Sequence, residues 1–356
     1  MNFKELLEQL KGAANELAQS RLMQFGRGNR RYVLAELMPE TVTDQNVIRE
    51  VRLAFENVIA ADGARYSPAQ KAKLVRGLDV NVELGHQDIS VQLTPEDFDA
   101  INAAVSGGNS LKAQATALGL VERAILSLVE KNEAQRGAGL AYGEYEVVGA
   151  GGLKAKVPFE LPDGHRARFE SSLADPDFDA MAAFDAMANM LAGAGHPLVR
   201  VVASTPTLQQ FARNAAVARY IVGENGGLVS IARLREFLSA EYGARLDAYD
   251  LRYTAQDGTR HRFLPEGVIC LFGSTDDQVS VTFDSETGED ELVLENVVGR
   301  TWIGRAAKRS APGRAVELYE IPGKGGGLIV DAWQTSAVGP TVPAAIGVLS
   351  TVESGS

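Results

Sequence analysis

Cysteine and histidine are scarce in this chain, and their scarcity excludes several kinds of site. The 356 residues include one cysteine, Cys270, so neither an internal disulfide nor a multi-cysteine metal site can form. The four histidines are His86, His165, His196 and His261, and no two of them have the spacing of metal ligands. A metal centre would therefore require the fold to bring distant residues together.

Long apolar runs and an excess of basic residues are also missing. No run reaches the ~18 apolar residues of a membrane-spanning helix, and residues 1–5 lack the charged-then-apolar layout of a signal peptide. Lys and Arg number 35 against 46 Asp and Glu, which gives a formal net charge of −11 at pH 7. We therefore expect a globular protein made in the cytoplasm, with no membrane contact and no broad basic face for nucleic acid.

The usual motifs of catalysis and cofactor binding are lacking as well, including the Gly-x-Ser-x-Gly elbow and the dinucleotide fingerprint. The Asp-rich stretch at 175–179 begins like a calcium loop, but Ala180 and Ala186 replace the required glycine and glutamate, so a capped helix start is the better interpretation. The glycine-rich stretch at 323–327 lacks the hydroxyl residue of a phosphate loop. The acidic stretch at 284–291 is typical of a solvated hairpin tip, with weak cation binding as the alternative. We predict no catalytic residue, no metal ligand and no cofactor, and therefore no enzyme.

The longest helical pattern covers residues 111–136. Four apolar residues recur at three- and four-residue spacing and share one helix face: Leu118, Val121, Ile125 and Leu128. Ser110 is the predicted N-cap, and Gly137 and Gly139 are the predicted stop. At roughly 1.5 Å per residue the helix would be about 39 Å long, which suits a scaffold for sheets and neighbouring subunits.

Stretches before this helix alternate apolar and polar residues, as half-buried strands do. They begin near Val47 and continue at 78–84 and 89–93. Because these strands precede any large core in the chain, we expect at least one hairpin to project from the body. Its apolar positions are candidates for contact with a neighbouring subunit: Val51, Leu53, Phe55, Leu78, Val80 and Val82.

Residues 3–19 predict a short amphipathic helix, which is either a solvated arm or an arm that lies on a neighbouring chain. Beyond the long helix, helices are predicted at about 177–191, 205–221 and 230–242. Strands are predicted at 143–149, 198–203, 245–254, 261–264, 268–272, 278–283, 291–298 and 315–321. This order of elements indicates the α+β class. The apolar run at 268–272 makes Cys270 a small core residue.

Several short motifs appear in a particular order along the chain. Tyr66-Ser67-Pro68 closes the extended region, Thr94-Pro95-Glu96-Asp97 precedes the long helix, Phe263-Leu264-Pro265 precedes an apolar strand, and Asp331-Ala332-Trp333-Gln334-Thr335 lies near the end. In this order the chain, from about Val33 onward, resembles the lambda-type phage major capsid protein family. That family has the Hong Kong 97-type shell fold.

The resemblance implies a division of the chain. The long helix would be the spine of a peripheral domain, and a β-hairpin called the E-loop would project from the body. The implied segments are an N-terminal arm at 1–40, the extended β region with the E-loop at 41–94, the peripheral domain with the spine helix at 95–160, the axial domain at 161–323, and C-terminal strands returning to the peripheral domain at 324–356.

The resemblance also implies a function. The protein would be a major capsid protein that assembles with itself, as hexamers and pentamers, into an icosahedral shell around phage DNA without sequence-specific binding. Portal, scaffold and decoration proteins are further candidate partners, and the protein would be found in the virion capsid after synthesis in the host cytoplasm. Two alternatives stay open at this point: an encapsulin-like bacterial nanocompartment shell protein, and a cytoplasmic enzyme with dispersed catalytic residues.

Overall fold

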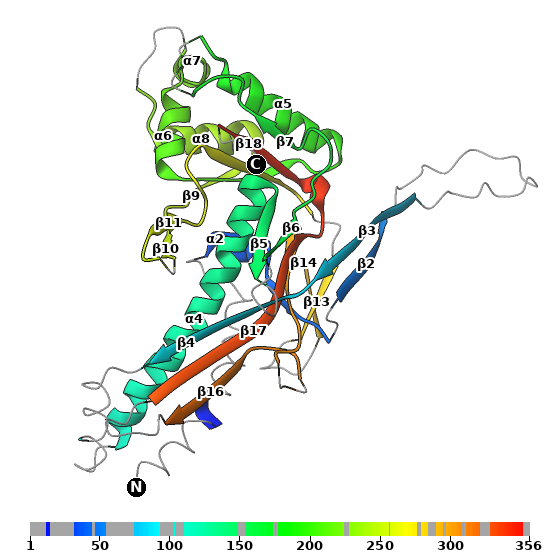
Figure 1. The fold of residues 1–356 in the computed structure, drawn as a ribbon. Helices are drawn as coiled ribbons and strands as arrows, with labels where there is room; N and C mark the ends of the chain where they lie inside the picture. Colours follow the sequence, from blue (N-terminus) through cyan, green and yellow to red (C-terminus); the bar gives the residue numbers. More distant parts are fainter. Residues whose placement is uncertain are drawn as a thin grey trace, which may run out of the picture.

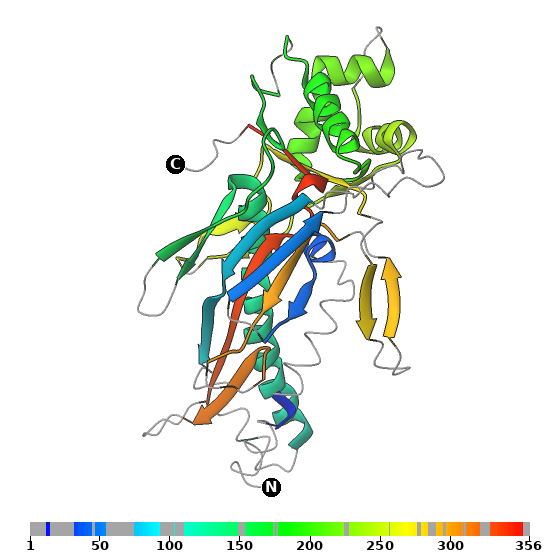
Figure 2. The same ribbon diagram turned by 90° about the vertical axis from the view of Figure 1, so that its right-hand side faces the viewer.

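The computed structural model describes the chain in segments. They are residues 12–14, 32–44, 47–54, 75–92, 103, 110–148, 154–173, 175, 177–223, 228–255, 257–275, 279–283, 290–294, 297–307, 309, 311–320 and 328–351. These segments form an elongated lower part around one long helix and a helix-rich upper part (Figures 1 and 2). None of the helices in these segments is long and apolar enough to span a bilayer.

The long helix α4 (Ser110–Tyr142) is the axis of the lower part (Figure 1). Its 33 residues correspond to about 50 Å at 1.5 Å per residue. The predicted apolar face is confirmed, because Val121, Ile125 and Leu128 are buried in the main core and Leu118 packs against it. The helix starts at Ser110 itself, one residue earlier than predicted, and it ends later than predicted.

Gly137 and Gly139 lie inside α4, so their prediction as a helix stop is wrong. A Cβ on Gly137 would stand 1.7 Å from the carbonyl oxygen of Phe263, and a Cβ on Gly139 would stand 2.6 Å from the Phe159 ring. Glycine is needed at both positions because other segments lie directly against the helix backbone. The helix ends instead at Gly143, whose φ of +81° is easily adopted by glycine.

Five strands form the lower sheet, on which α4 lies (Figure 1). They are β1 (Glu40–Val42), β4 (Gly85–Gln92), β15 (Gly299–Ile303), β16 (Ala315–Glu320) and β17 (Leu328–Pro340). The long strand β17 pairs antiparallel with β4, β15 and β16, and β1 pairs parallel with β15. The short helix α2 (Val33–Leu37) precedes β1 and packs beside α4, so it belongs to this layer.

Five other strands form the upper sheet, in the order β7-β18-β12-β8-β9. They are β7 (Arg166–Arg168), β8 (Leu198–Ala203), β9 (Arg245–Ala248), β12 (Val268–Gly273) and β18 (Ile346–Ser350), the last preceded by the 3-10 turn η2 (Pro343–Ala345). Four helices lie over this sheet: α5 (Ala180–Gly193), α6 (Thr205–Arg213), α7 (Ala215–Val222) and α8 (Ile231–Tyr242) (Figure 2). Strand β18 falls within the segment 324–356, where the resemblance implied C-terminal strands.

Strand β12 joins the two parts, because its two faces belong to different cores. Ile269 and Leu271 pack with the upper helices, whereas Val268, Cys270 and Phe272 pack with the core that surrounds α4. All six residues of the strand are buried, as the apolar run predicted. Burial raises the pKa of the Cys270 thiol to about 12, so the cysteine is an unreactive core residue.

The Cys270→Ala variant is therefore expected to fold normally. The exchange of one small buried residue for another should cost about 1 kcal/mol. Thermal melting of the purified protein would measure the loss, and electron microscopy would show whether particles still form. Loss of particle formation by a variant that still melts cooperatively would contradict the structural role of Cys270.

The predicted helix at 205–221 is two helices, because Asn214 interrupts it. The side-chain oxygen of Asn214 accepts hydrogen bonds from the backbone N–H groups of Ala216 and Val217, which caps α7. Its amide nitrogen donates to the carbonyl oxygens of Leu173 and Phe178, at 3.2 and 2.9 Å. The break therefore fixes the loop before α5 against the upper helices.

Four two-stranded ribbons complete the described chain. They are formed by β2 (Val47–Ala54) with β3 (Val75–Glu83), β5 (Glu144–Val148) with β6 (Lys154–Pro158), β10 (Arg252–Thr254) with β11 (Arg260–Arg262), and β13 (Val279–Phe283) with β14 (Asp290–Leu294). The β2–β3 ribbon leaves the body at an angle in Figure 1, and the β13–β14 ribbon stands beside the body in Figure 2.

Strand pairing joins segments that are far apart in the chain. β15 and β16 lie within residues 161–323 but pair with β17 in the lower sheet. β18 lies within residues 324–356 but pairs with β12 and β7 in the upper sheet. The chain thus returns to the lower sheet before residue 323 and ends in the upper sheet. Sequence order alone could not reveal these long-range pairings.

Candidate functional site: a buried polar network and the assembly surfaces

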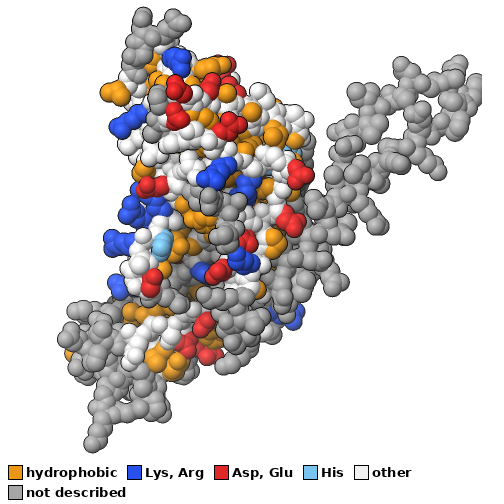
Figure 3. All heavy atoms as spheres, turned by 45° about the horizontal axis from the view of Figure 1, so that its top comes forward, with side chains coloured by type: hydrophobic (Ala, Val, Ile, Leu, Met, Phe, Trp, Pro, Cys, Tyr) orange, Lys and Arg blue, Asp and Glu red, His pale blue; other side chains and the backbone are white. Residues whose placement is uncertain are grey.

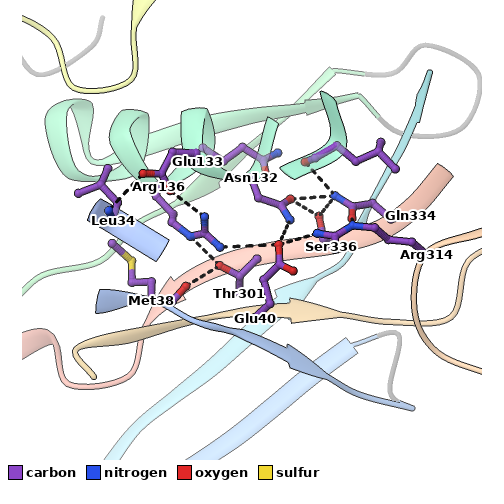
Figure 4. A network of polar contacts seen from close by, with 12 residues as sticks. Leu34, Met38, Glu40, Asn132, Glu133, Arg136, Thr301, Arg314, Gln334 and Ser336 are labelled. Atoms are coloured by element: carbon purple, nitrogen blue, oxygen red, sulfur yellow. Dashed lines mark hydrogen bonds and ion pairs between the residues drawn. The ribbon is translucent and has the colours of Figure 1, made fainter. Parts of the chain in front are cut away.

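A network of buried polar side chains joins α4 to the lower sheet (Figure 4). Its charged members are Glu40 on β1, Glu133 and Arg136 on α4, and Arg314 just before β16. These side chains are no more than 3% exposed. Two carboxylates and two guanidinium groups leave the network electrically neutral, which is the condition under which buried charges are tolerated.

The two arginines of the network connect its carboxylates. Arg136 Nη1 donates to Glu133 Oε2 at 2.8 Å, and Arg136 Nε donates to Thr301 Oγ1 at 2.9 Å. Arg314 Nη2 donates to Glu40 Oε1 at 2.5 Å, and Arg136 Nη2 lies 4.0 Å from the same oxygen. The carboxylate of Glu40 therefore ties strand β1 to a residue of the helix and to a residue beside β16.

Glu133 also forms hydrogen bonds with two segments that lie outside the network. Its Oε1 accepts a hydrogen bond from the backbone N–H of Leu34 at 3.2 Å and one from the Tyr249 hydroxyl at 2.5 Å. Burial, together with the charge of Glu133, raises the pKa of the Tyr249 hydroxyl, so this group remains a donor. The helix α2 and the chain after β9 are thereby fixed to α4.

Amide and hydroxyl groups continue the network along β17. Gln334 Nε2 donates to Gln87 Oε1 at 2.6 Å and to Asn132 Oδ1 at 3.0 Å, while Gln334 Oε1 accepts from Arg314 Nε at 2.8 Å. The Ser336 hydroxyl donates to Asn132 Oδ1 at 2.9 Å. Side chains of β4, β17 and α4 are thus locked in one arrangement, which fixes the helix on the sheet.

The sequence analysis missed this network, although a signal was present. Asn132 follows Ile125 by seven residues and Arg136 follows Leu128 by eight, so both continue the apolar face of the helix. A polar residue at a core position of a helix indicates a buried partner or a surface. The partners Glu40, Arg314 and Gln334 are far away in sequence, and for this reason pattern analysis could not name them.

The charge of Glu40 predicts a pH dependence of stability. Burial acts to raise the pKa of this carboxyl, but the charges of Arg314 and Arg136 and the hydrogen bonds from Arg314 and Asn132 outweigh it, so the pKa is lowered. A lowered carboxyl pKa contributes stability above the unfolded-state pKa of about 4.3, and this contribution disappears as the pH falls through the folded-state pKa.

We therefore expect that, as the pH is lowered below about 4, the melting temperature of the native protein decreases more steeply than that of Glu40→Gln. At pH 7 the Glu40→Gln variant should be less stable than the native protein. Glu144→Gln is a suitable control, because Glu144 pairs with Lys156 at the surface. Melting curves recorded from pH 2.5 to 7 would test this. Parallel pH profiles for the native protein and Glu40→Gln would contradict it.

The predicted contact residues lie on or beside the β2–β3 ribbon. Val51 is opposite Asp79, and Glu50 is opposite Val80. Val51, Leu53, Leu78, Val80 and Val82 are therefore brought together in one hydrogen-bonded ribbon. Phe55 lies outside the described residues.

The four histidines are distributed over the whole molecule. His165 Nδ1 lies 2.9 Å from the carbonyl oxygen of Ile346, and His196 Nδ1 lies 2.8 Å from that of Ser274. His86 is on β4 and His261 is on β11. Within the described residues, no group of three or more His, Cys, Asp or Glu side chains is arranged to hold a metal ion.

The acidic residues at 175–179 form a helix start, as predicted. The carboxylate of Asp179 accepts the backbone N–H of Ala182 and so caps α5. The carboxylate of Asp175 accepts hydrogen bonds from the Ser171 hydroxyl and the backbone N–H of Asp177. The stretches at 284–289 and 323–327 lie outside the described residues.

Comparison with known proteins identifies the family. A family model described as phage major capsid protein E matches residues 37–286, which is more than half of the chain. The chain belongs to this family. The capsid protein has no match among curated protein sequences.

Two solved structures establish the fold of the capsid protein. One is assigned as the capsid protein of a prophage of E. coli CFT073; it has a TM-score of 0.54 and 13% identity, and the match covers 94% of this chain and 99% of that chain. The other is a phage-related protein from Bordetella bronchiseptica RB50, with a TM-score of 0.50, 11% identity, and coverage of 93% and 96%. The fold is the Hong Kong 97-type capsid fold, as expected from the order of motifs.

Family and fold together give the general role. The capsid protein is a structural protein of the phage virion, and it functions as many copies of itself in a shell. The buried network is therefore part of the scaffold of a shell subunit, and the ribbons that leave its body are the candidate contacts between subunits.

Proposed function

We propose that the capsid protein assembles as hexamers and pentamers into an icosahedral shell that encloses phage DNA, and that the β2–β3 ribbon is its E-loop. The observation that carries this proposal is the pairing of the ribbon. Among the described strands, β2 and β3 hydrogen-bond only with each other, and the ribbon leaves the lower sheet at an angle (Figure 1).

A ribbon of this kind requires a partner. Two strands alone are marginally stable in water, and this ribbon carries five of the apolar candidate residues: Val51 and Leu53 on β2, and Leu78, Val80 and Val82 on β3. A neighbouring copy would cover these positions. Such a contact joins different surfaces of two copies, and repeated head-to-tail contacts of this type close into rings.

The same proposal assigns the two parts of the subunit. The lower sheet with α4 corresponds to the peripheral domain, and the upper sheet with its helices corresponds to the axial domain. The network around Arg136 then keeps the spine helix and the lower sheet rigid, so that the angle at which the ribbon leaves the body is the same in every copy.

Expression of the capsid protein followed by electron microscopy tests the proposal. Closed particles of uniform size are the expected result. A stable monomer that never forms particles, at any concentration or in the presence of the other head proteins of the phage, would contradict it.

Further partners and properties follow from a shell function. Portal, scaffold and decoration proteins are the expected binding partners, and synthesis takes place in the host cytoplasm. No catalytic turnover is expected, because the polar network is enclosed between α4 and the sheet, and its groups position backbone segments.

The capsid protein is expected to bind duplex DNA only weakly. Its acid excess repels phosphate groups, and packed DNA must be able to move against the wall of the shell. Binding of a labelled duplex at ~0.2 M salt, measured by fluorescence anisotropy, should be undetectable at micromolar protein, because few counterions would be released. Tight binding at this salt concentration would contradict the prediction.

A further inference from the structure

A basic pocket lies between the C-terminal half of α4 and the β10–β11 ribbon, and its volume is about 340 Å³. Ala138 and Tyr142 of the helix line one side, and Arg252, Arg260 and His261 of the ribbon line the other. In Figure 3, Lys and Arg side chains and a histidine lie along the left-hand edge, which is the side where Figure 1 places β10 and β11. Positive charge is thus concentrated there on a protein whose net charge is −11.

The register of the ribbon places three arginines on one face. Arg252 is opposite Arg262, and Thr254 is opposite Arg260. Residues that are directly opposite, or two positions apart on one strand, share a face of a ribbon. Arg252, Arg260 and Arg262 are therefore neighbours, and like charges at such positions repel each other and destabilise the pairing of the strands. The ribbon is more stable when negative charge compensates these arginines.

Arg262 is compensated within the subunit. It donates to Asp250 at 2.6 Å and to Glu266 at 3.0 Å, and Glu266 is the one carboxylate among the residues that line the pocket. Arg252 and Arg260 are exposed, and neither guanidinium group makes a hydrogen bond or an ion pair with another described residue. Two positive charges at the pocket are therefore available to a ligand.

The arginines are carried by a supported ribbon. Tyr253 packs against Phe263, with ring centroids 5.2 Å apart, and against His261, at 5.7 Å. The backbone of Phe263 lies against Gly137 of α4, so the ribbon is fixed to the helix. A ligand that binds here has to order little of the backbone, and such preorganisation favours binding.

A doubly charged phosphate group matches the pocket in charge and in shape. A phosphate monoester carries about −1.5 to −2 charges at pH 7, which corresponds to the two uncompensated arginines. Its oxygens accept paired hydrogen bonds from the planar guanidinium group. A phosphodiester of the DNA backbone carries a single charge and would leave one arginine uncompensated. The volume of about 340 Å³ is at the lower end of the roughly 300–1,000 Å³ range of small-ligand sites.

We infer that Arg252 and Arg260 bind a doubly charged phosphate group in this pocket, supplied either by inorganic phosphate or by the terminal phosphate of a nucleotide. Both guanidinium groups donate to oxygens of the same phosphate, which removes the repulsion across the ribbon. The bound group stabilises the folded subunit, because it binds the folded state and not the unfolded chain. The site belongs to a single subunit, so the inference does not depend on shell assembly, and it agrees with weak binding of duplex DNA.

Titration of the purified capsid protein with inorganic phosphate, followed by line broadening in ³¹P NMR spectra, tests the inference. In ~20 mM salt at pH 7.5 we expect a dissociation constant on the order of 1 mM, because two charge-assisted contacts at an exposed site give weak affinity. Arg252→Gln/Arg260→Gln should weaken binding at least about tenfold. The control Arg219→Gln/Arg233→Gln, on the exposed surfaces of α7 and α8, should bind phosphate as the native protein does.

Two further ligands distinguish the source of the phosphate. Tighter binding of adenosine 5′-monophosphate than of inorganic phosphate would identify a nucleotide as the source, and equal binding would identify free phosphate; both results support the site. A DNA duplex without terminal phosphates should not compete at ~20 mM salt, because its backbone offers only singly charged phosphates. Competition by this duplex would assign the pocket to the DNA backbone and overturn the inference.

The outcomes also separate the inference from the proposed function. If the native protein binds no phosphate, or if Arg252→Gln/Arg260→Gln binds it equally well, the phosphate site is wrong, whether or not shells form. If phosphate binds to a protein that never forms shells, the site stands and the shell function falls. Circular dichroism confirms that each variant is folded, and phosphate should raise the melting temperature of the native protein but not that of Arg252→Gln/Arg260→Gln.

Discussion

Removal of residues 52–76, with a short Gly/Ser link in their place, is expected to give a folded, soluble subunit that no longer builds shells. The deletion takes away the outer end of the β2–β3 ribbon, beyond the irregularity between Val51 and Leu53, and it leaves the pairs from Val47–Glu83 to Val51–Asp79 intact. No residue of the lower or the upper sheet is touched, so the two cores should remain.

The deletion should have a large effect on shell formation because every subunit makes the same contact. Each large apolar side chain that a neighbour covers contributes roughly 1.5–3 kcal/mol. One such contact is weak, but every subunit makes it, and a closed shell depends on all of them together. The deletion removes two of the six candidate contact residues, Leu53 and Phe55, together with the whole segment that joins β2 to β3, and every subunit loses them, so shells should no longer form.

Circular dichroism and thermal melting would report the fold of the deletion variant, and electron microscopy would report assembly. If the deletion unfolds the subunit, the ribbon belongs to the core; if shells form at normal yield, the ribbon is not a contact between subunits.

The second variant with a large expected effect is Arg136→Met, which should lower the free energy of unfolding of the subunit. The change removes the hydrogen bond to Glu133 and the one to Thr301, and it leaves two carboxylates, Glu133 and Glu40, with only Arg314 as a positive neighbour. Removal of one partner of a buried ion pair typically lowers the free energy of unfolding by about 3–5 kcal/mol, because the charge of the other partner stays buried without compensation.

For a subunit of this size, such a loss should lower the melting temperature by roughly 5–10 °C. The double variant Glu133→Leu/Arg136→Met should recover part of it, because no unpaired charge is left on the helix. Arg262→Met serves as the control: Arg262 also makes two ion pairs, but its partners Asp250 and Glu266 are 45% and 56% exposed, so its loss should be much smaller. Equal effects of the two single variants would show that burial of the network contributes nothing.

Local patterns in the sequence determined most of the elements of the lower part. The apolar spacing of Leu118, Val121, Ile125 and Leu128 predicted the long helix and its buried face, because a helix must present one apolar stripe to a core. Alternation predicted β3 and β4, and the apolar run predicted the fully buried strand β12. The order of motifs predicted the family, which the family model confirms.

Other positions had an ambiguous signal in the sequence. A glycine after a helical pattern fits a helix end, but Gly137 and Gly139 are glycines because Phe263 and Phe159 lie against the helix there. Asn214 within a helical pattern fits a surface residue, but it caps one helix and ends another. In each case the decisive neighbour comes from elsewhere in the chain.

The sequence by itself thus determined the elements, the α+β class, the buried Cys270 and the family of this capsid protein. Only the tertiary structure decided which strands share a sheet, that Asn132 and Arg136 of α4 meet Glu40, and that Glu40 meets Arg314. The physical reason is distance along the chain. Periodicity reports how a residue relates to neighbours within one element, whereas ion pairs and strand registers join residues that meet only after folding.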